Sequence, residues 1–162
     1  MASELTVQTL RGPTSGSNAD TVLIPSGQTL HAPGHVIQVI QNIGSVVTTN
    51  SSTPTIVASA SITIQSTNKV YAACVGDMNS TGAGAWNYYQ IYRDSTAVGQ
   101  RYIGQAENAS HNLPFSNFYL DQPGSSGTYT YSLKCWQGTG SMVYGETGSI
   151  QAPTMVLMEI AQ

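Results

Sequence analysis

Hydrophobic and polar residues alternate without a break between positions 128 and 136. The odd-numbered positions carry Tyr, Tyr, Leu and Cys, and the even-numbered positions carry Thr, Thr, Ser, Lys and Trp. Because successive side chains of a strand point to opposite sides of its sheet, this pattern predicts a half-buried β-strand. A shorter strand is expected at residues 118–120, and the turn formers of Asp121–Gly127 connect the two. Such a unit has one apolar face and needs a partner sheet.

Further strand candidates follow one another closely from residue 35 to the end of the chain. Turn residues (Gly, Asn, Asp, Pro and Ser) separate them, and no window shows apolar residues at helical spacing with capping residues. Many short strands with polar turns predict an all-β fold, an antiparallel sandwich or jelly roll. The expected strands are His35–Ile40, Ser45–Thr48, Ile56–Gln65, Val70–Val75, Trp86–Arg93, Ala97–Tyr102, Phe115–Leu120, Thr128–Trp136, Met142–Tyr144 and Thr154–Ile160.

Two of these strands are apolar on both faces. Residues 154–160 alternate between two apolar sets, and residues 86–92 carry aromatic side chains on both sides. The outer face of a strand in a solitary sandwich is expected to be polar, so contact between copies of the chain would explain the pattern better. We therefore expect a homo-oligomer, with interface candidates Met155, Leu157, Tyr89 and Ile91.

Residues 1–34 differ from the rest of the chain. They contain two short strand patterns and two turn-rich links, which is too little to enclose a core. We expect an extended N-terminal stem or anchoring arm at 1–34 and a sandwich knob at 35–162. The apolar positions of the arm are Leu5, Val7, Leu10, Val22 and Ile24.

Composition narrows the classes of partner. Charged residues make up 8% of the chain, the net charge is −3, and only five residues are Lys or Arg. A nucleic-acid partner is not expected, because phosphate contacts need clustered cations. No apolar run is long enough to insert into a membrane, and the first residues lack the apolar core of a signal peptide. Neutral polar residues keep the surface soluble, as is common in β-rich extracellular and virion proteins.

Candidate chemistry is sparse, and no enzyme activity or cofactor is expected. The sequence has no nucleophile elbow, phosphate-binding loop or spaced pair of carboxylates. His31 and His35 are four apart, but the intervening Pro33 forbids the helix that would bring them together on a metal. Cys74 and Cys135 lie in strand-like runs, and the sequence leaves open whether they pair.

Aromatic and amide side chains are the candidates for contact with a receptor. Rings stack on the apolar faces of sugars, and amides hydrogen bond to sugar hydroxyls. A core or subunit-contact role competes with this interpretation at each aromatic position, and the polar loop at 105–114 is the segment best placed to reach a receptor. The candidates are Asn108, His111, Asn112, Trp86 and Tyr88, followed by Asn87, Tyr89 and Trp136.

The chain also resembles a widespread group of virion proteins from marine and freshwater bacteriophages. The resemblance lies in Gly34–Gln41, Ser61–Ala72, Tyr92–Gly99, Asn117–Lys134 and Val156–Ile160. The opening segments 3–16 and 24–34 are also similar, so the resemblance spans nearly the whole chain. These motifs are turns and strands without a catalytic signature. The resemblance implies a jelly-roll knob related in topology to the complement and tumour-necrosis-factor heads, with three copies around an axis.

The function expected from these observations is that of a phage structural protein. It would be assembled in the host cytoplasm and displayed on the virion as a tail-fibre, short-fibre or spike knob. Its arm would bind other virion proteins, and its outer loops would contact a host surface glycan or protein. Two alternatives stay open: a capsid decoration or cement protein of the phage head, and a free-standing, monomeric carbohydrate-binding module.

Overall fold

The computed structural model describes residues 32–80, 82–105, 107, 112–145 and 152–162. These residues form eleven strands and no helix. The first sheet, sheet A, contains β1 (Val36–Ile43), β2 (Val47–Thr49), β4 (Lys69–Ser80), β8 (Asn112–Asp121), β10 (Met142–Tyr144) and β11 (Thr154–Ile160). The second sheet, sheet B, contains β3 (Thr55–Ile64), β5 (Trp86–Arg93), β6 (Thr96–Ala97), β7 (Tyr102–Gln105) and β9 (Gly127–Thr139). Of the expected arm at 1–34, residues 1–31 lie outside the described residues. These include its apolar positions Leu5, Val7, Leu10, Val22 and Ile24.

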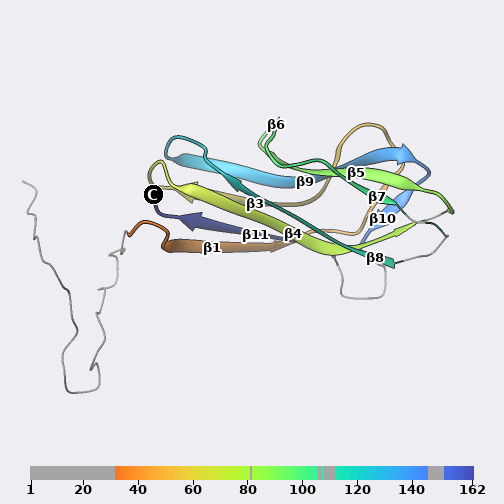
Figure 1. Ribbon diagram of the computed structural model, residues 1–162, viewed down its shortest axis with the longest axis horizontal. Helices are drawn as coiled ribbons and strands as arrows, with labels where there is room; N and C mark the ends of the chain where they lie inside the picture. Colours follow the sequence, from red (N-terminus) through yellow and green to blue (C-terminus); the bar gives the residue numbers. More distant parts are fainter. Residues whose placement is uncertain (1–31, 81, 106, 108–111, 146–151) are drawn as a thin grey trace, which may run out of the picture. The chain divides into compact units, whose positions relative to one another are not determined.

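Every strand pair in both sheets is antiparallel, which confirms the predicted all-β antiparallel sandwich. Strand β4 is the centre of sheet A. One of its edges pairs with β8, and its other edge pairs first with β11 and then with β10. Strands β1 and β2 extend this second side by pairing with β11 and β10. The two sheets lie as two layers (Figure 1).

Strand β9 organises sheet B. It contains the alternating residues 128–136 and pairs with β3 on one side and β5 on the other. The predicted strand Ala97–Tyr102 is wrong in its middle part. There the backbone N–H groups of Val98 and Gly99 both donate to the carbonyl oxygen of Ile91, at 3.1 and 3.2 Å, so the chain leaves the strand path between β6 and β7.

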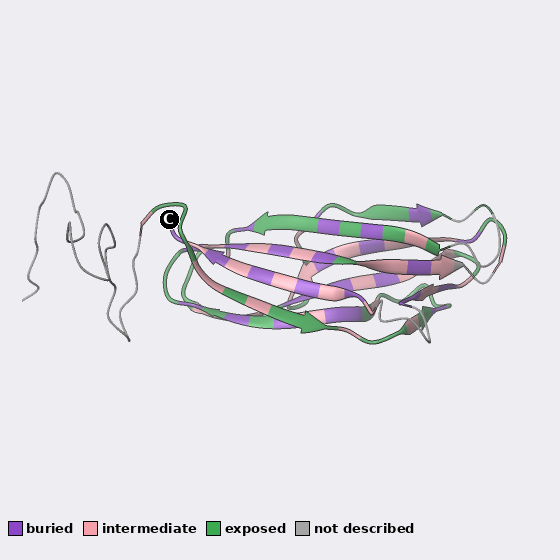
Figure 2. Cartoon of the chain, turned by 90° about the horizontal axis from the view of Figure 1, so that it is seen from below, coloured by how far each residue is buried: buried purple, intermediate pink, exposed green. Residues whose placement is uncertain are grey.

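The core lies between the two sheets and is built from every second residue of the central strands. Buried and more exposed residues alternate along these strands (Figure 2). Sheet B contributes side chains such as Ile62, Ile91 and Leu133, and sheet A contributes side chains such as Val70 and Leu157. Burying one side chain of this size stabilises the fold by about 1.5–3 kcal/mol.

The predicted interface candidates lie inside this core. Met155, Leu157 and Ile91 have no exposed surface, and Tyr89 is 8% exposed. They contact the opposite sheet of the same chain and are not accessible to another copy, so this assignment is wrong. The physical reason is that a strand with two apolar faces offers two candidates for the outward face. Alternation alone does not say which face the second sheet covers.

Both cysteines are free thiols in the same core. Burial raises the pKa of Cys74 to about 12 from an ordinary value of 9.0. Burial likewise raises the pKa values of Cys135 and Tyr144. Each of these groups is held in its neutral form because a charge would lose its hydration there.

We therefore expect the free energy of unfolding to fall at alkaline pH. The Cys74 thiol ionises near pH 9.0 in the unfolded chain but near pH 12 in the folded one. Its contribution is complete below pH 9 and is lost as pH rises from there toward 12, because the unfolded state then holds fewer protons. Urea denaturation at about pH 8 and about pH 10.5, at one protein concentration, measures the effect. The Cys74→Ala variant should show a shallower fall, and equal stability of the wild type at both pH values would contradict the prediction.

Candidate functional site

Two of the predicted receptor-contact residues, Trp86 and Tyr88, lie together on the outward face of sheet B. They occupy alternate positions of β5 and are half-buried. Trp136 of β9 lies opposite Tyr88 in the strand register, so it belongs to the same face. Asn87 and Tyr89 occupy the other face of β5 and are buried in the core, so their assignment as sugar contacts is wrong.

The remaining candidates do not join this group in the described structure. Asn108 and His111 lie outside the described residues. Asn112 is the first residue of β8, in sheet A, and is exposed. The Nδ2 of Asn79 donates a hydrogen bond to its Oδ1 at 2.6 Å, which links β4 to β8 across the sheet.

The aromatic rings on sheet B are held in fixed positions. The ring centroid of Tyr88 is 5.0 Å from that of Trp86, nearly perpendicular to it, and 5.4 Å from that of Trp136. Trp86 also lies directly on Gly138, where a Cβ atom would be 2.1 Å from the indole ring. A residue other than glycine at this position would displace the indole from its place on the sheet.

Two cations flank these rings, and sequence reasoning missed both. The guanidinium carbon of Arg101 is 4.6 Å from the ring centroid of Tyr88, and Nζ of Lys134 is 4.4 Å from that of Tyr92. Lys134 pairs with Gln90 in the register, and Arg101, just before β7, lies on the other side of β5. Lys134 could have been found as an outward neighbour of Trp136 on β9, whereas Arg101 lies in a stretch without strand alternation. We call this set of residues (Trp86, Tyr88, Gln90, Arg101, Lys134 and Trp136) the aromatic–cationic surface.

A hollow of about 460 Å³ adjoins the aromatic–cationic surface. Gln90, Gly99, Gln100, Arg101 and Ile103 line it. The Nε2 of Gln90 donates to the carbonyl oxygen of Gly99 at 2.6 Å, so the amide inside the hollow is held in one orientation. An oriented amide beside a guanidinium and an aromatic ring can bind hydroxyl and carboxylate groups.

The outward face of sheet A is different in character, because most of its positions on β1, β11, β4 and β8 are apolar, with Gln41, Thr154 and Ser116 among them. Val39, Phe118 and Leu120 are 55%, 58% and 48% exposed. The register places Val39, Met158, Tyr71 and Leu120 side by side in one row across four strands. The rings of Tyr71 and Phe118 stack with centroids 6.3 Å apart. We call this surface the apolar face; it also includes Val36, Ile43, Ala73, Val75, Val156 and Ile160.

Sheet B shows what a water-facing surface looks like in this protein. On the pair of strands β3 and β9, Ser61 faces Thr130 and Thr63 faces Thr128. The hydroxyl oxygens of each pair are 2.8 Å apart and hydrogen bonded, and all four residues are exposed. This part of sheet B is therefore polar, whereas Ile56 and Ile103, elsewhere on the same outward face, are 51% and 58% exposed.

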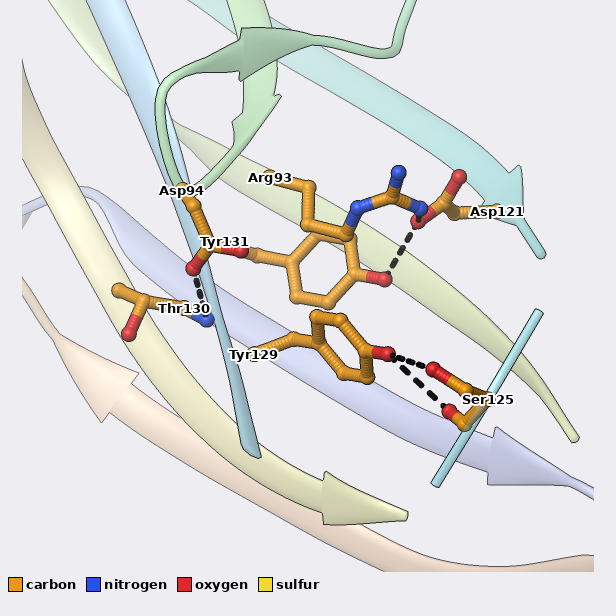
Figure 3. Close-up of polar contacts among 7 residues, drawn as sticks. All are labelled: Arg93, Asp94, Asp121, Ser125, Tyr129, Thr130 and Tyr131. Carbon is orange, nitrogen blue, oxygen red and sulfur yellow. Dashed lines mark hydrogen bonds and ion pairs between the residues drawn. The ribbon is translucent and has the colours of Figure 1, made fainter. Parts of the chain in front are cut away.

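A polar cluster joins the two sheets at the corner where β8 ends (Figure 3). Nη1 of Arg93 and the hydroxyl of Tyr131 both donate to Oδ2 of Asp121, each at 2.6 Å. Arg93 and Tyr131 belong to sheet B and Asp121 to sheet A. Burial raises the pKa of Tyr131, and its hydrogen bond to the Asp121 carboxylate raises it further, so the hydroxyl remains a donor.

Two turns near this cluster also carry polar contacts. In Figure 3, the hydroxyl of Tyr129 points to Ser125, with its donated hydrogen bond to the backbone carbonyl oxygen 3.1 Å long. Asp94, at the turn between β5 and β6, has a positive φ of 52° and accepts a hydrogen bond from the backbone N–H of Thr130. These contacts fix the loops at one end of the sandwich.

Asp121 and Glu159 carry the two buried carboxylates of the described residues. They lie in one register row, two strands apart, which separates their backbones by about 10 Å. The fully buried Val70 stands between them, and both carboxylates are buried. Glu159 accepts hydrogen bonds from the side chains of Gln38 and Asn68, at 2.6 and 2.8 Å. Both carboxylates therefore hold the fold together.

No group of three or more His, Cys, Asp or Glu residues in the described part of the chain could hold a metal ion. The same residues contain no helix that is long and apolar enough to span a membrane. No protein-family model matches the chain, and no curated protein matches it in sequence. The surfaces described above are therefore the basis for any proposal about function.

We expect the Asp121→Ala variant to lose about 3 kcal/mol of unfolding free energy. The substitution leaves the buried hydroxyl of Tyr131 without an acceptor and the partly buried Arg93 without its partner. Denaturant unfolding at a fixed protein concentration measures the loss. The control is Asp94→Asn, which removes a charge at the exposed turn and should change stability by less than about 0.5 kcal/mol. A loss at Asp121 as small as that of the control would contradict a linking role.

Proposed function

We propose that the protein is a structural protein of a phage virion. It is a jelly-roll knob, with residues 1–34 as its arm, that assembles as a homotrimer and serves as a tail-fibre, short-fibre or spike head that contacts the host surface. The observation that carries the proposal is the apolar face of sheet A, because it gives the sandwich an extended surface for contact with further copies.

The composition of the apolar face supports contact between copies. Among the outward positions of its described strands, only Lys69 and Asp77 are charged, and they lie near opposite ends of β4. Depletion of charge at the centre, with large apolar and aromatic side chains, is typical of an interface core. Covering several such side chains contributes about 1.5–3 kcal/mol each. Closed rotational symmetry is the usual way in which identical copies bury one patch.

The path of the chain supports the jelly-roll assignment. The chain passes from sheet A to sheet B after β2 and returns with β4, then crosses again to β5, β8, β9 and β10. The last strand, β11, lies between β1 and β4, so the first and last strands of the sandwich are neighbours in sheet A. Repeated crossing between two antiparallel sheets is the pattern of Greek-key and jelly-roll sandwiches.

The placement on a virion is supported by the resemblance of the strand and turn motifs and by the low charge of the chain. A capsid decoration protein would share this architecture, and its arm would bind the shell instead of a tail. The aromatic–cationic surface favours a second candidate from another class, a carbohydrate-binding module. Such a module would work as a monomer.

We expect the purified chain to have three times its monomer mass of 17.1 kDa in solution. Size-exclusion chromatography with light scattering at micromolar concentration measures this mass. The double variant Phe118→Ser, Leu120→Ser should run as a folded monomer, because it replaces two exposed side chains of the apolar face. The matched control is Ile56→Ser, an exposed apolar residue on the outward face of sheet B, which should leave the trimer intact.

A wild-type chain that is folded and monomeric under these conditions would overturn the trimeric knob and favour the binding module. The virion placement has its own test. Immunogold labelling of phage particles with an antibody against residues 35–162 should mark tail fibres or short fibres. Label confined to the head would favour the decoration protein, and unlabelled particles that lack the protein by mass spectrometry would overturn the virion role.

A further inference from the structure

The cations of the described residues are not spread evenly over the protein. The chain has a net charge of −3, yet Arg101 and Lys134 both lie on the aromatic–cationic surface. The ion pair found among the described residues is that of Arg93 with Asp121, so these two cations are not neutralised by a described side chain. Their charges therefore add up on one face of an acidic protein.

Acidic side chains are absent from the strand positions of this face in the described part of the chain. Asp77, Asp121 and Glu159 belong to sheet A. Asp94 occupies the turn between β5 and β6, and Glu107 follows the end of β7. A ligand that lies across β7, β5 and β9 therefore meets two positive charges and no strand-borne negative charge, which favours an anion.

The arrangement of the two cations restricts which anion fits. Arg101 and Lys134 lie on opposite sides of β5, so about 10 Å separates their backbones. The ring of Tyr88 holds the guanidinium in place, which leaves its planar fork oriented for a carboxylate. Their charged groups lie over different rings, Tyr88 and Tyr92, four residues apart on β5. This arrangement suits an extended polymer with a charge on separate units better than a single compact ion.

The neighbouring row of the same face is suited to sugar rings. Ile103, Tyr88 and Trp136 lie side by side across three strands. Flat aromatic side chains stack on the apolar faces of pyranose rings, while the oriented amide of Gln90 can hydrogen bond to sugar hydroxyls. Nucleic acid fits less well, because binding to a phosphate backbone depends on many clustered cations.

We propose that the aromatic–cationic surface binds an acidic polysaccharide, one whose sugars carry carboxylate groups. Arg101 and Lys134 bind carboxylates on different sugar units, Gln90 hydrogen bonds to a hydroxyl in the hollow, and Trp136 stacks on a sugar ring. Tyr88 holds the Arg101 guanidinium in place. The biological role of this site rests on the proposed contact with the host surface. The acidic polysaccharide is then the host molecule that is contacted. The binding itself requires only the described sandwich.

The test compares acidic polymers with matched neutral ones, using the full chain. Polygalacturonate, alginate and hyaluronate are the acidic probes, and carboxyl-reduced polygalacturonate and dextran are the neutral probes. Calorimetry or biolayer interferometry should show binding to at least one acidic probe. Where polygalacturonate is bound, its carboxyl-reduced form should bind at least about tenfold more weakly. Absence of binding to all three acidic probes, or equal binding to a neutral one, would overturn the proposal.

Matched variants locate the site. Arg101→Gln and Lys134→Gln should each weaken binding about tenfold, since each removes one charged contact. Lys69→Gln removes a cation on the apolar face of sheet A and should leave binding unchanged. Tyr88→Ala should weaken binding because Arg101 is then less ordered. Equal effects of Lys69→Gln and Arg101→Gln would show a general charge effect and contradict the proposed site.

Two further measurements separate this proposal from the proposed assembly. A short acidic oligosaccharide, which cannot bridge copies, should bind equally well to the wild type and to the Phe118→Ser, Leu120→Ser variant. If the wild type is monomeric and binds the oligosaccharide, the proposed trimer is wrong and the proposed binding site stands. If the wild type is trimeric and binds no acidic probe, the binding site is wrong and the trimer stands. The wild type could instead bind a single-stranded oligonucleotide and no glycan. If the Arg101→Gln variant then lost this oligonucleotide binding, the surface would be assigned to nucleic acid.

Discussion

Sheet A has apolar side chains on both of its faces, and the rest of the architecture depends on how each face is kept from water. One face packs on sheet B and forms the core with residues such as Val70, Cys74 and Leu157. The other face presents Val39, Phe118 and Leu120. Packing in the core accounts for the stability of the single sandwich. The second face is an exposed apolar surface that contact between copies would bury. The proposed assembly is thus a consequence of the sequence of one sheet.

The sandwich was predictable from sequence because its signal is local. Strict alternation in residues 128–136 reflects a strand that is covered on one side, and these residues form the central part of β9. The faces of β5 and β11 were not predictable, because both sides of these strands are apolar. Met155 and Leu157 were assigned to an interface and lie in the core, while Met158, one position away, belongs to the apolar face. A shift of one residue exchanges the two faces.

The candidate site was predictable only in part for a related reason. Trp86 and Tyr88 could be proposed from residue type and spacing on one strand. Arg101 comes close to Tyr88 because the chain turns away after β6 and returns in β7, a path set by backbone hydrogen bonds to Ile91. Similarly, Asp121 meets Arg93 and Tyr131 only when the two sheets pack. Contacts between sheets depend on tertiary structure, and a single sequence has no short-range signal for them.

The two outward faces have complementary consequences. Because sheets A and B are opposite layers of one sandwich, copies that pack through sheet A leave the aromatic–cationic surface of sheet B uncovered. Each copy would then present Arg101, Lys134 and the aromatic rings to the outside, and a long polymer could bind several copies at once. Effective concentration makes such multivalent binding much stronger than a single contact without any new interaction. The Ser and Thr pairs on β3 and β9 add no charge beside the site, so its selectivity for carboxylates depends on Arg101 and Lys134.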